Sequence, residues 1–467
     1  MLFSSITFLY FFLPCVILIY FTVPKKFKNS VLLFSSLFFY GWGEPRYLIF
    51  LAAAIVQGYI FGLLIEKHRN NKKSSAIFLT VTILISLGML GYFKYADFFI
   101  NNFNAVFKTD IPLLKITLPI GISFYTFQLL SYSIDIYRGN TAAQRNFINF
   151  AAYISMFPQL VAGPIVRYSD IASQLSDRKH TLDSAAYGTK RFVIGLSKKV
   201  IFANVLGELT ESFRCSTEKT VLFVWLFIIA FTLHIYYDFS GYSDMAIGLG
   251  SLFGFKFPEN FNYPYISRSI TEFWRRWHMS LGSWFRDYLY IPLGGNRVPK
   301  WRWMFNILIV WMATGFWHGA SWNFIIWGLW FAILLILEKN FLRRFLGKYR
   351  IISHLYVLFA LIISFVIFDS SSIKYAASVF TSMFGLKGTP LFGTESIYFL
   401  KSYGILITAA AFGATPIPAM FVKKISNFKY SGFAVSIIEP LFLTVLLAVS
   451  TSFLIDGSFN PFLYFRF

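Results

Sequence analysis

Long apolar runs are the feature that most limits how this chain can fold. Each run is long enough to cross the ~30 Å hydrocarbon layer of a membrane as a helix, and the chain as a whole is 57% hydrophobic and only 13% charged. The strands of a membrane barrel would be about ten residues long and would alternate apolar with polar side chains. The pattern therefore predicts an all-α, multi-span membrane protein. The six clearest runs are residues 6–23, 47–65, 76–93, 221–237, 351–368 and 435–454.

The positive charges indicate which loops face the cytoplasm. Lys and Arg number 42 and Asp and Glu number 21, which gives a formal net charge of +21. In a soluble protein this excess would indicate a nucleic-acid partner. Here the basic clusters are short and flank the apolar runs, as the positive-inside rule describes, so membrane lipid is expected as a partner and nucleic acid is not. The clusters are residues 24–28, 66–73, 339–350 and 423–429.

Neither a metal site nor a disulfide framework is expected. The two cysteines, Cys15 and Cys215, are far apart in the sequence and form no redox pair or zinc-ligand pattern. The histidines lack the close spacing that a membrane di-iron site would require. They lie at positions 68, 180, 234, 278, 318 and 354.

Residues 303–337 form a stretch of 35 residues without Lys, Arg, Asp or Glu. As one straight helix this stretch would be about 52 Å long and would overshoot the membrane. Basic residues flank both ends, so both ends are expected on the cytoplasmic side. The first arm, 303–317, would be only about 22 Å long, so the turn is expected inside the membrane. Flexible backbone and hydrogen-bond partners for the turn are supplied by Gly315, Gly319, Ser321 and Asn323.

His318 lies beside this turn. An ionisable residue at membrane depth is by default a candidate functional residue. A neutral imidazole removed from water can act as a general base toward a hydroxyl, or it can carry an acyl group. Both roles indicate acyl transfer. The alternative is a neutral imidazole that hydrogen-bonds to a neighbouring helix and contributes only to packing.

A second histidine, His278, lies in the segment 271–295. Wound as a helix, this segment has one apolar sector of about 120°, which predicts a basic amphipathic helix. The sector contains Trp274, Trp277, His278, Leu281, Trp284, Phe285 and Tyr288. Such a helix could lie in the cytoplasmic interface, held by aromatic side chains and anionic headgroups. Its arginines could also attract a negatively charged donor, such as a phosphate-bearing thioester or an acidic carrier protein. The two interpretations are compatible, and they place His278 near the mouth of a cavity. The arginines concerned are Arg275, Arg276 and Arg286.

Two acidic residues, Asp238 and Asp244, flank Gly241 next to an apolar run. We expect them to cap a helix that is broken at Gly241, with lining or polarising a cavity as the alternative. Gly, Pro, Ser and Asn also recur at membrane depth in residues 118–127 and 157–166. Broken backbone is tolerated there only where protein or a wet cavity covers it, so an internal cavity is expected. Interfacial helices and loops are expected in the mixed segments 94–117, 165–220 and 256–302, with segments that dip into the membrane as the alternative.

These motifs resemble the membrane-bound O-acyltransferase (MBOAT) superfamily, in the branch that contains the alginate O-acetyltransferase membrane subunit. The most specific pair is Trp-Arg-Arg-Trp-His at 274–278 and Trp-His-Gly at 317–319. The resemblance implies that His318 is the essential histidine and His278 the second one, both lining a passage through the protein. One departure is Asp369, since relatives usually show Phe-Arg-Ala in this region. The matching stretches are 118–139, 157–168, 236–250, 258–295, 317–330 and 460–467.

We expect one polytopic domain over residues 1–467, with re-entrant and interfacial helices around a central funnel or tunnel. The resemblance implies an O-acetyltransferase of the bacterial cytoplasmic (inner) membrane that binds no cofactor. Its donor would be a cytoplasmic thioester, with acetyl-CoA as the expected substrate. Its acceptor would be an extracytoplasmic polysaccharide such as alginate or peptidoglycan, usually reached through a separate extracytoplasmic acetyltransferase.

Two alternatives stay open at this point. One is a D-alanyl transfer protein of teichoic acid modification, which would take its acyl group from a carrier protein. The other is a channel or transporter without covalent chemistry. For the acyltransferase, the candidate catalytic residues are His318 and His278. The candidates for donor binding or cavity lining are Arg275, Arg276, Arg286, Asp238, Asp244 and Asn323.

Overall fold

The computed structural model describes residues 1–426 and 431–457, and over this part the chain is helical and contains no β-strand. Seven of the described helices are long and apolar enough to cross a membrane. The prediction of an all-α, multi-span membrane protein is thus confirmed, while the central funnel stays a prediction. The matching stretch 460–467 and the end of the basic cluster 423–429 lie outside the described residues. The seven helices are Pro45–Lys67, Lys72–Phe107, Val221–Leu252, Trp322–Lys348, Arg350–Asp369, Thr394–Gly413 and Ser436–Ile455.

Five of the six predicted runs coincide with these seven helices. The remaining run, 6–23, forms the shorter apolar helix Phe8–Thr22. Two of the seven were not among the predicted runs. Trp322–Lys348 contains the second arm of the uncharged stretch, and Thr394–Gly413 has a mean hydropathy of only 1.2, which explains why its pattern is weak in the sequence.

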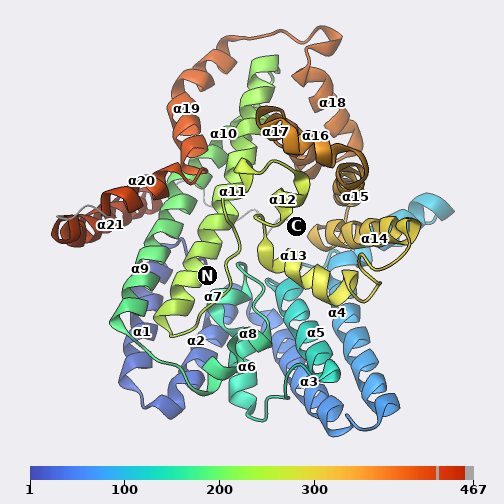
Figure 1. The fold of residues 1–467 in the computed structure, drawn as a ribbon, viewed down its shortest axis with the longest axis vertical. Coiled ribbons are helices and arrows are strands. Elements are labelled where there is room, and N and C mark those ends of the chain that lie inside the picture. Colours follow the sequence, from blue (N-terminus) through green and yellow to red (C-terminus); the bar gives the residue numbers. More distant parts are fainter. Residues whose placement is uncertain (427–430, 458–467) are drawn as a thin grey trace. The chain divides into compact units, whose positions relative to one another are not determined.

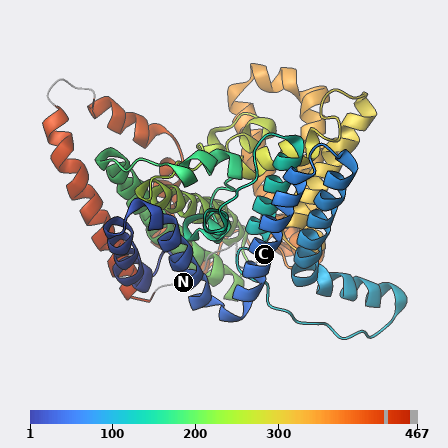
Figure 2. The same ribbon diagram turned by 90° about the horizontal axis from the view of Figure 1, so that it is seen from below.

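Two compact units divide the described chain. Unit 1 contains residues 1–192 and 245–259, and unit 2 contains residues 193–244 and the described residues from 260 onward. The helices are shown from two sides in Figures 1 and 2. The expectation of one polytopic domain stays a prediction. Unit 1 includes α1 (Leu13–Thr22), α2 (Lys28–Gly43), α3 (Leu48–Lys67), α4 (Lys72–Phe107), α5 (Ile122–Arg138), α6 (Phe147–Ser155), α7 (Phe157–Leu160), α8 (Tyr168–Ser176) and most of α9 (Leu182–Ser197).

Unit 1 contains both segments of broken backbone that the sequence predicts. α5 begins at Ile122, directly after Gly121, whose φ of 75° lies in the region that favours glycine. In the second segment α6 ends at Ser155, the helix α7 lasts only four residues, and Gly163 has a φ of 113°. These breaks are confirmed, and the cavity inferred from them stays a prediction.

α4 is longer than predicted. Residues 94–107 were expected in an interfacial segment, but they continue the apolar helix as far as Phe107. Asn71 caps its first turn, since the Asn71 side chain accepts a hydrogen bond of 3.2 Å from the backbone N–H of Ser74. In Figure 2 the last turns of α4 and the loop after it, in light blue, extend away from α3 and α5.

The helix α11 (Val221–Leu252), whose residues up to Asp244 belong to unit 2, passes Gly241 without a break. The expected break at Gly241 is therefore wrong. A Cβ at Gly241 would lie 2.8 Å from the carbonyl oxygen of Gly195 on α9, so the glycine allows two helix backbones to meet. The other helices of unit 2 include η4 (Lys198–Asn204), α10 (Val205–Cys215), η5 (Pro264–Ile266), α12 (Ile270–Trp274), α13 (Met279–Phe285), η6 (Arg286–Tyr290), α14 (Lys300–His318), α15 (Trp322–Leu337), η7 (Glu338–Leu342), α16 (Arg343–Lys348), α17 (Arg350–Asp369), α18 (Ile373–Met383), η8 (Leu386–Gly388), α19 (Thr394–Gly413), α20 (Ile417–Ser426) and α21 (Ser431–Ile455).

α14 and α15 form the hairpin that the uncharged stretch predicts, with the turn at residues 319–321. Glycines allow the two helices to touch. A Cβ at Gly315 would lie 2.2 Å from the carbonyl oxygen of Phe324, and a Cβ at Gly328 would lie 2.2 Å from that of Trp311. The break and the hairpin are confirmed, while the depth of the turn in the membrane stays a prediction.

The segment 271–295 is not the continuous amphipathic helix that its periodicity predicts. α12 and α13 are separated by residues 275–278, and a π-helix, η6, follows α13. His278 itself has a φ of 44°, in the left-handed region that few residues other than glycine adopt. Backbone hydrogen bonds to a distant segment replace the helical ones at this break. The N–H of Met279 donates to the carbonyl of Asn260 at 3.0 Å, and the N–H of Asn262 donates to the carbonyl of Arg276 at 2.9 Å.

Candidate active site

His318 is the last residue of α14, immediately before the turn of the hairpin. Its side chain is buried and three aromatic rings surround the imidazole. The ring centroids of Trp317, Trp327 and Phe368 lie 5.0, 4.9 and 5.6 Å from that of His318. Trp327 belongs to α15 and Phe368 to the last turn of α17. The imidazole therefore lies in an apolar, aromatic environment.

The cavity beside His318 is small. Its volume is about 10 Å³, which is the lower limit for one water molecule. A substrate group can therefore reach His318 only after a side chain of the cavity wall moves. The wall consists of Ile235, Phe273, Trp274, Trp277, His318, Trp327, Phe331, Phe365 and Phe368.

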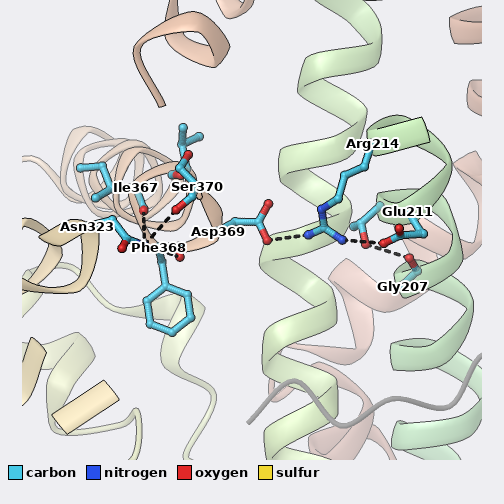
Figure 3. Close-up of polar contacts among 10 residues, drawn as sticks. Gly207, Glu211, Arg214, Asn323, Ile367, Phe368, Asp369 and Ser370 are labelled. Atoms are coloured by element: carbon cyan, nitrogen blue, oxygen red, sulfur yellow. Dashed lines mark hydrogen bonds and ion pairs between the residues drawn. The ribbon is translucent and has the colours of Figure 1, made fainter. Parts of the chain in front are cut away.

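Asn323 holds the end of α17 in place beside His318. Its side-chain amide donates to the carbonyl oxygens of Phe368 and Ser370 at 3.3 and 2.9 Å (Figure 3). The last carbonyls of a helix have no partner within the helix, so this amide satisfies groups that would otherwise be buried without a hydrogen bond. Sequence reasoning places Asn323 at the turn and expects it to bind donor or line a cavity. The observed contacts instead position Phe368, and a role toward the donor stays a prediction.

An ion pair fixes the same end of α17 to α10. The Nη2 atom of Arg214 lies 2.5 Å from the Oδ1 atom of Asp369, and its Nη1 atom lies 3.0 Å from the Oε2 atom of Glu211 (Figure 3). Asp369 is the residue at which the sequence differs from the Phe-Arg-Ala pattern that the resemblance leads us to expect. The carboxylate at this position thus has an arginine partner from α10, which sequence reasoning did not identify.

His278 lies at the break between α12 and α13, with 1% of its surface exposed. Its Nδ1 atom lies 3.1 Å from the Oδ1 atom of Asn260. The ring of Phe239 packs edge-on against it at 4.6 Å, and Trp317, which also touches His318, lies at 6.0 Å. Burial, followed by the charge of nearby His318, lowers the pKa of His278 well below its ordinary value. His278 is therefore neutral at neutral pH.

A cavity of about 580 Å³ adjoins His278. Arg275 and Arg286 line it as well, and both are exposed. Trp274 also lines this cavity and is shared with the small cavity of His318. The third predicted arginine, Arg276, is held by Glu272 of α12, with 2.9 Å between Nη2 and Oε1. The structure thus brings two of the three arginines to the cavity of His278.

A second cavity, of about 570 Å³, shares Arg275 with the first. Its single carboxylate, Glu338, already accepts hydrogen bonds from the first residues of α12. The Oε1 and Oε2 atoms of Glu338 accept hydrogen bonds from the backbone N–H groups of Ile270 and Thr271. The cations of this cavity therefore exceed its acids. They are Arg268, Arg275, Lys339 and Arg343.

Asp238 and Asp244 form ion pairs with two adjacent lysines of the π-helix η4. The Oδ1 atom of Asp238 lies 2.5 Å from the Nζ atom of Lys199, and the Oδ2 atom of Asp244 lies 2.7 Å from that of Lys198. The expected role as caps of a broken helix is wrong, because α11 is continuous through both residues. A role in lining or polarising a cavity stays a prediction.

Sequence reasoning missed three side chains that support the site, namely Asn260, Lys199 and Arg214. A signal existed for Lys199, because two adjacent lysines directly before an apolar stretch are costly at membrane depth unless each has a partner. No comparable signal existed for Asn260 or Arg214, whose partners lie 18 and 155 residues away in the sequence.

The arrangement as a whole provides two buried imidazoles, separated by one tryptophan, next to a basic cavity. Among the described residues no group of three or more His, Cys, Asp or Glu side chains could hold a metal ion. The site can therefore supply proton transfer and nucleophilic attack from imidazole.

Comparison with known proteins shows similarity over the whole chain. The family model described as "MBOAT, membrane-bound O-acyltransferase family" matches residues 142–373. The chain is 42% identical to the "Probable alginate O-acetylase AlgI" of Azotobacter vinelandii over 82% of this chain and 78% of the relative. It is 37% identical to the protein of the same name in Pseudomonas putida over 100% of both chains. It is also 33% identical to the "Peptidoglycan O-acetyltransferase" of Helicobacter pylori, over 100% of this chain and 98% of the relative.

Proposed function

This chain belongs to the membrane-bound O-acyltransferase family, and we propose that it is the acetyltransferase that carries acetyl groups from cytoplasmic acetyl-CoA toward an extracytoplasmic polysaccharide. As a member of the family it is a multi-pass membrane O-acyltransferase. The donor, the acceptor, the transfer partner and the location in the bacterial inner membrane are parts of the proposal. The observation that carries it is the basic cavity that His278 lines and that shares Trp274 with the small cavity beside His318.

The charge of the two larger cavities supports a polyphosphate donor. Coenzyme A has several phosphate groups, and these bind best to arginine and lysine. The cavity of about 570 Å³ offers an excess of such cations, and it shares Arg275, Tyr290 and Ile307 with the cavity of His278. The phosphopantetheine arm of a carrier protein has only one phosphate. The cation count therefore favours a nucleotide thioester over the carrier protein that D-alanyl transfer would use.

The two imidazoles supply the chemistry. In acetyl transfer to a hydroxyl, a C–O bond forms at the thioester carbonyl, the C–S bond breaks, and one proton passes from the hydroxyl to the thiolate. The imidazole of His278 or of His318 can remove that proton, and His318 can also hold the acetyl group between donor and acceptor. Transfer requires Trp274 or a neighbouring side chain to move, because the cavity at His318 is smaller than an acetyl group.

The level of His318 along α17 supports delivery to the outer side. α17 begins at Arg350, at the end of the basic cluster expected in the cytoplasm, and its 20 residues are about 30 Å long. His318 packs against Phe368, one residue from the opposite end. With the basic cluster in the cytoplasm, this arrangement supports a position of the imidazole nearer the extracytoplasmic side. Relatives named for alginate and for peptidoglycan support a polysaccharide acceptor, reached with the help of a separate extracytoplasmic acetyltransferase.

The test is transfer of radiolabelled acetyl from acetyl-CoA in membranes that contain this protein and its extracytoplasmic partner, with label measured in polysaccharide. His318→Ala is expected to abolish transfer. His68→Ala, at a histidine of unit 1 that lines none of the three cavities of the site, serves as the matched control and is expected to leave transfer unchanged. Unchanged transfer in His318→Ala would indicate a channel or transporter instead. Transfer of D-alanine from a carrier protein, without transfer from acetyl-CoA, would identify the alternative donor.

A further inference from the structure

Asn260 is buried at 0% exposure and is surrounded by donors from α13 and an acceptor from α11. Its Oδ1 atom lies 3.1 Å from the Nδ1 atom of His278. The same oxygen accepts from the backbone N–H and the hydroxyl of Ser280 at 3.3 and 2.9 Å. Its Nδ2 atom donates to the hydroxyl of Ser243 at 3.0 Å. Both ends of the amide are thus engaged.

These contacts determine which amide atom faces His278. A backbone N–H can only donate, so the atom of Asn260 that faces the N–H of Ser280 must be the oxygen. In the flipped orientation two donors would face each other in a buried site, which is unfavourable. Because the amide oxygen has no hydrogen, the hydrogen between it and the Nδ1 atom of His278 belongs to the imidazole. Neutral His278 is therefore the Nδ1–H tautomer, and its lone pair is on Nε2.

The same residue also fixes the backbone next to His278. The carbonyl of Asn260 accepts the N–H of Met279 at 3.0 Å, directly after the left-handed His278. An unfavourable backbone conformation persists only where the surroundings enforce it, and such conformations cluster at functional sites. One residue thus determines both the position of the His278 ring and its tautomer.

We propose that Asn260 is the positioning residue that makes the Nε2 atom of His278 the proton-exchanging atom of acetyl transfer. This inference rests on the proposed function. The proton that leaves the attacking hydroxyl is accepted by Nε2 and is returned to the departing thiolate, so the imidazole is unchanged after one turnover. Because His278 lines the donor cavity, the thiolate is expected to form beside this imidazole.

The Nδ1 atom of His278 is hydrogen-bonded to Asn260, and other charged or titratable groups lie near the imidazole. His318 on α14 acts on its charge, and Arg275, Arg286 and Tyr290 line the same cavity. On α11, the carboxylates of Asp244 and Asp238 form ion pairs with Lys198 and Lys199. A carboxylate in place of the Asn260 amide would therefore be a new charge next to the imidazole.

Two substitutions separate positioning from a structural role. Asn260→Ala removes the acceptor, and kcat is expected to fall about 10- to 100-fold, the range seen when the partner that orients a functional histidine is lost, with KM for acetyl-CoA nearly unchanged. Asn260→Asp keeps an acceptor for Nδ1–H, and the hydroxyl of Ser243 can rotate to donate. This variant is expected to retain more activity than Asn260→Ala. Its carboxylate raises the pKa of His278, so the acid limb of the pH–kcat profile moves up by about one unit or more.

The matched control is Asn306→Ala. Asn306 is equally buried in unit 2, at 2% exposure, and donates to the carbonyl of Leu293 at 3.1 Å, but it lines neither large cavity. It is expected to leave kcat per folded molecule and the pH profile unchanged. If Asn260→Ala keeps wild-type kcat, or if Asn260→Asp shows no shift of the acid limb, the inference is overturned.

A readout without turnover distinguishes this inference from the proposed function. The 15N chemical shifts of histidine-labelled protein, with His278 assigned by its loss in His278→Gln, report the tautomer directly. The Nδ1–H form is expected in the wild type, and a mixture of tautomers in Asn260→Ala. An Nε2–H form in the wild type would overturn the inference even if acetyl transfer occurs. Absence of acetyl transfer with the Nδ1–H form intact would overturn the proposed function instead.

Discussion

Removing one member of the Lys199–Asp238 ion pair is expected to destabilise the protein strongly. The two side chains are only 2% and 1% exposed, with 2.5 Å between Nζ and Oδ1. Asp238→Ala takes the carboxylate away and leaves the ammonium group of Lys199 in a buried site. Leaving one buried charge without its partner costs about 3–5 kcal/mol, compared with about 1 kcal/mol for an average substitution.

Two further variants show that the cost comes from the unpaired charge. Lys199→Met combined with Asp238→Leu replaces both charges with apolar side chains, which is often neutral or stabilising, so the double variant is expected to be more stable than Asp238→Ala. Lys25→Ala breaks the pair with Asp177, whose side chains are 71% and 73% exposed. That loss is expected to leave the free energy of unfolding nearly unchanged, because water and salt screen exposed charges.

The assay is the free energy of unfolding of the detergent-purified protein, measured together with acetyl transfer per folded molecule. The reasoning would be refuted by an Asp238→Ala protein whose stability lies within about 1 kcal/mol of the wild type. If Asp238→Ala folds normally but loses transfer, Asp238 lines or polarises the cavity, as the alternative interpretation of the sequence holds.

The remaining predictions concern the donor cavity, the end of α17 and the pH profile. Arg275→Ala and Arg343→Ala each remove one phosphate contact worth about 1.5–3 kcal/mol, so the KM for acetyl-CoA is expected to rise roughly 10- to 150-fold with kcat unchanged. An unchanged KM would place the donor elsewhere. Arg214→Asp alone puts two carboxylates side by side and is expected to lower kcat, whereas Arg214→Asp with Asp369→Arg restores the pair and most of the activity. No recovery in this swap would show that the pair does not position α17. Because burial and His318 lower the pKa of His278, the neutral base persists as the pH falls, and the acid limb of the kcat profile is expected below the ordinary histidine pKa of about 6.5. A limb at or above that value would contradict this reasoning.

The hairpin around His318 could be predicted because it follows from the length of the uncharged stretch and from the charges at its two ends. A stretch of 35 residues without charge is too long for one crossing and has basic residues at both ends, so only a turn satisfies both constraints. The structure places that turn at residues 319–321, among the glycine and serine that the sequence marks.

The break at His278 could not be predicted, because its cause is a tertiary contact. Residues 275–278 contain no glycine or proline, and their periodicity fits a helix well. Backbone hydrogen bonds to residues 260–262 compete with the helical ones and prevail. Gly241 illustrates the opposite error, since a glycine read as a helix break is in fact a place where two helices touch.

The glycine contacts between α14 and α15 have a mechanical consequence. The backbones of the two helices are in close contact at Gly315 and Gly328, so one helix cannot slide or tilt without the other. His318 and Trp327 therefore share one rigid frame. The imidazole therefore keeps its position during the catalytic cycle. The side chains on the opposite wall of the cavity and the two substrates are the parts that have to move.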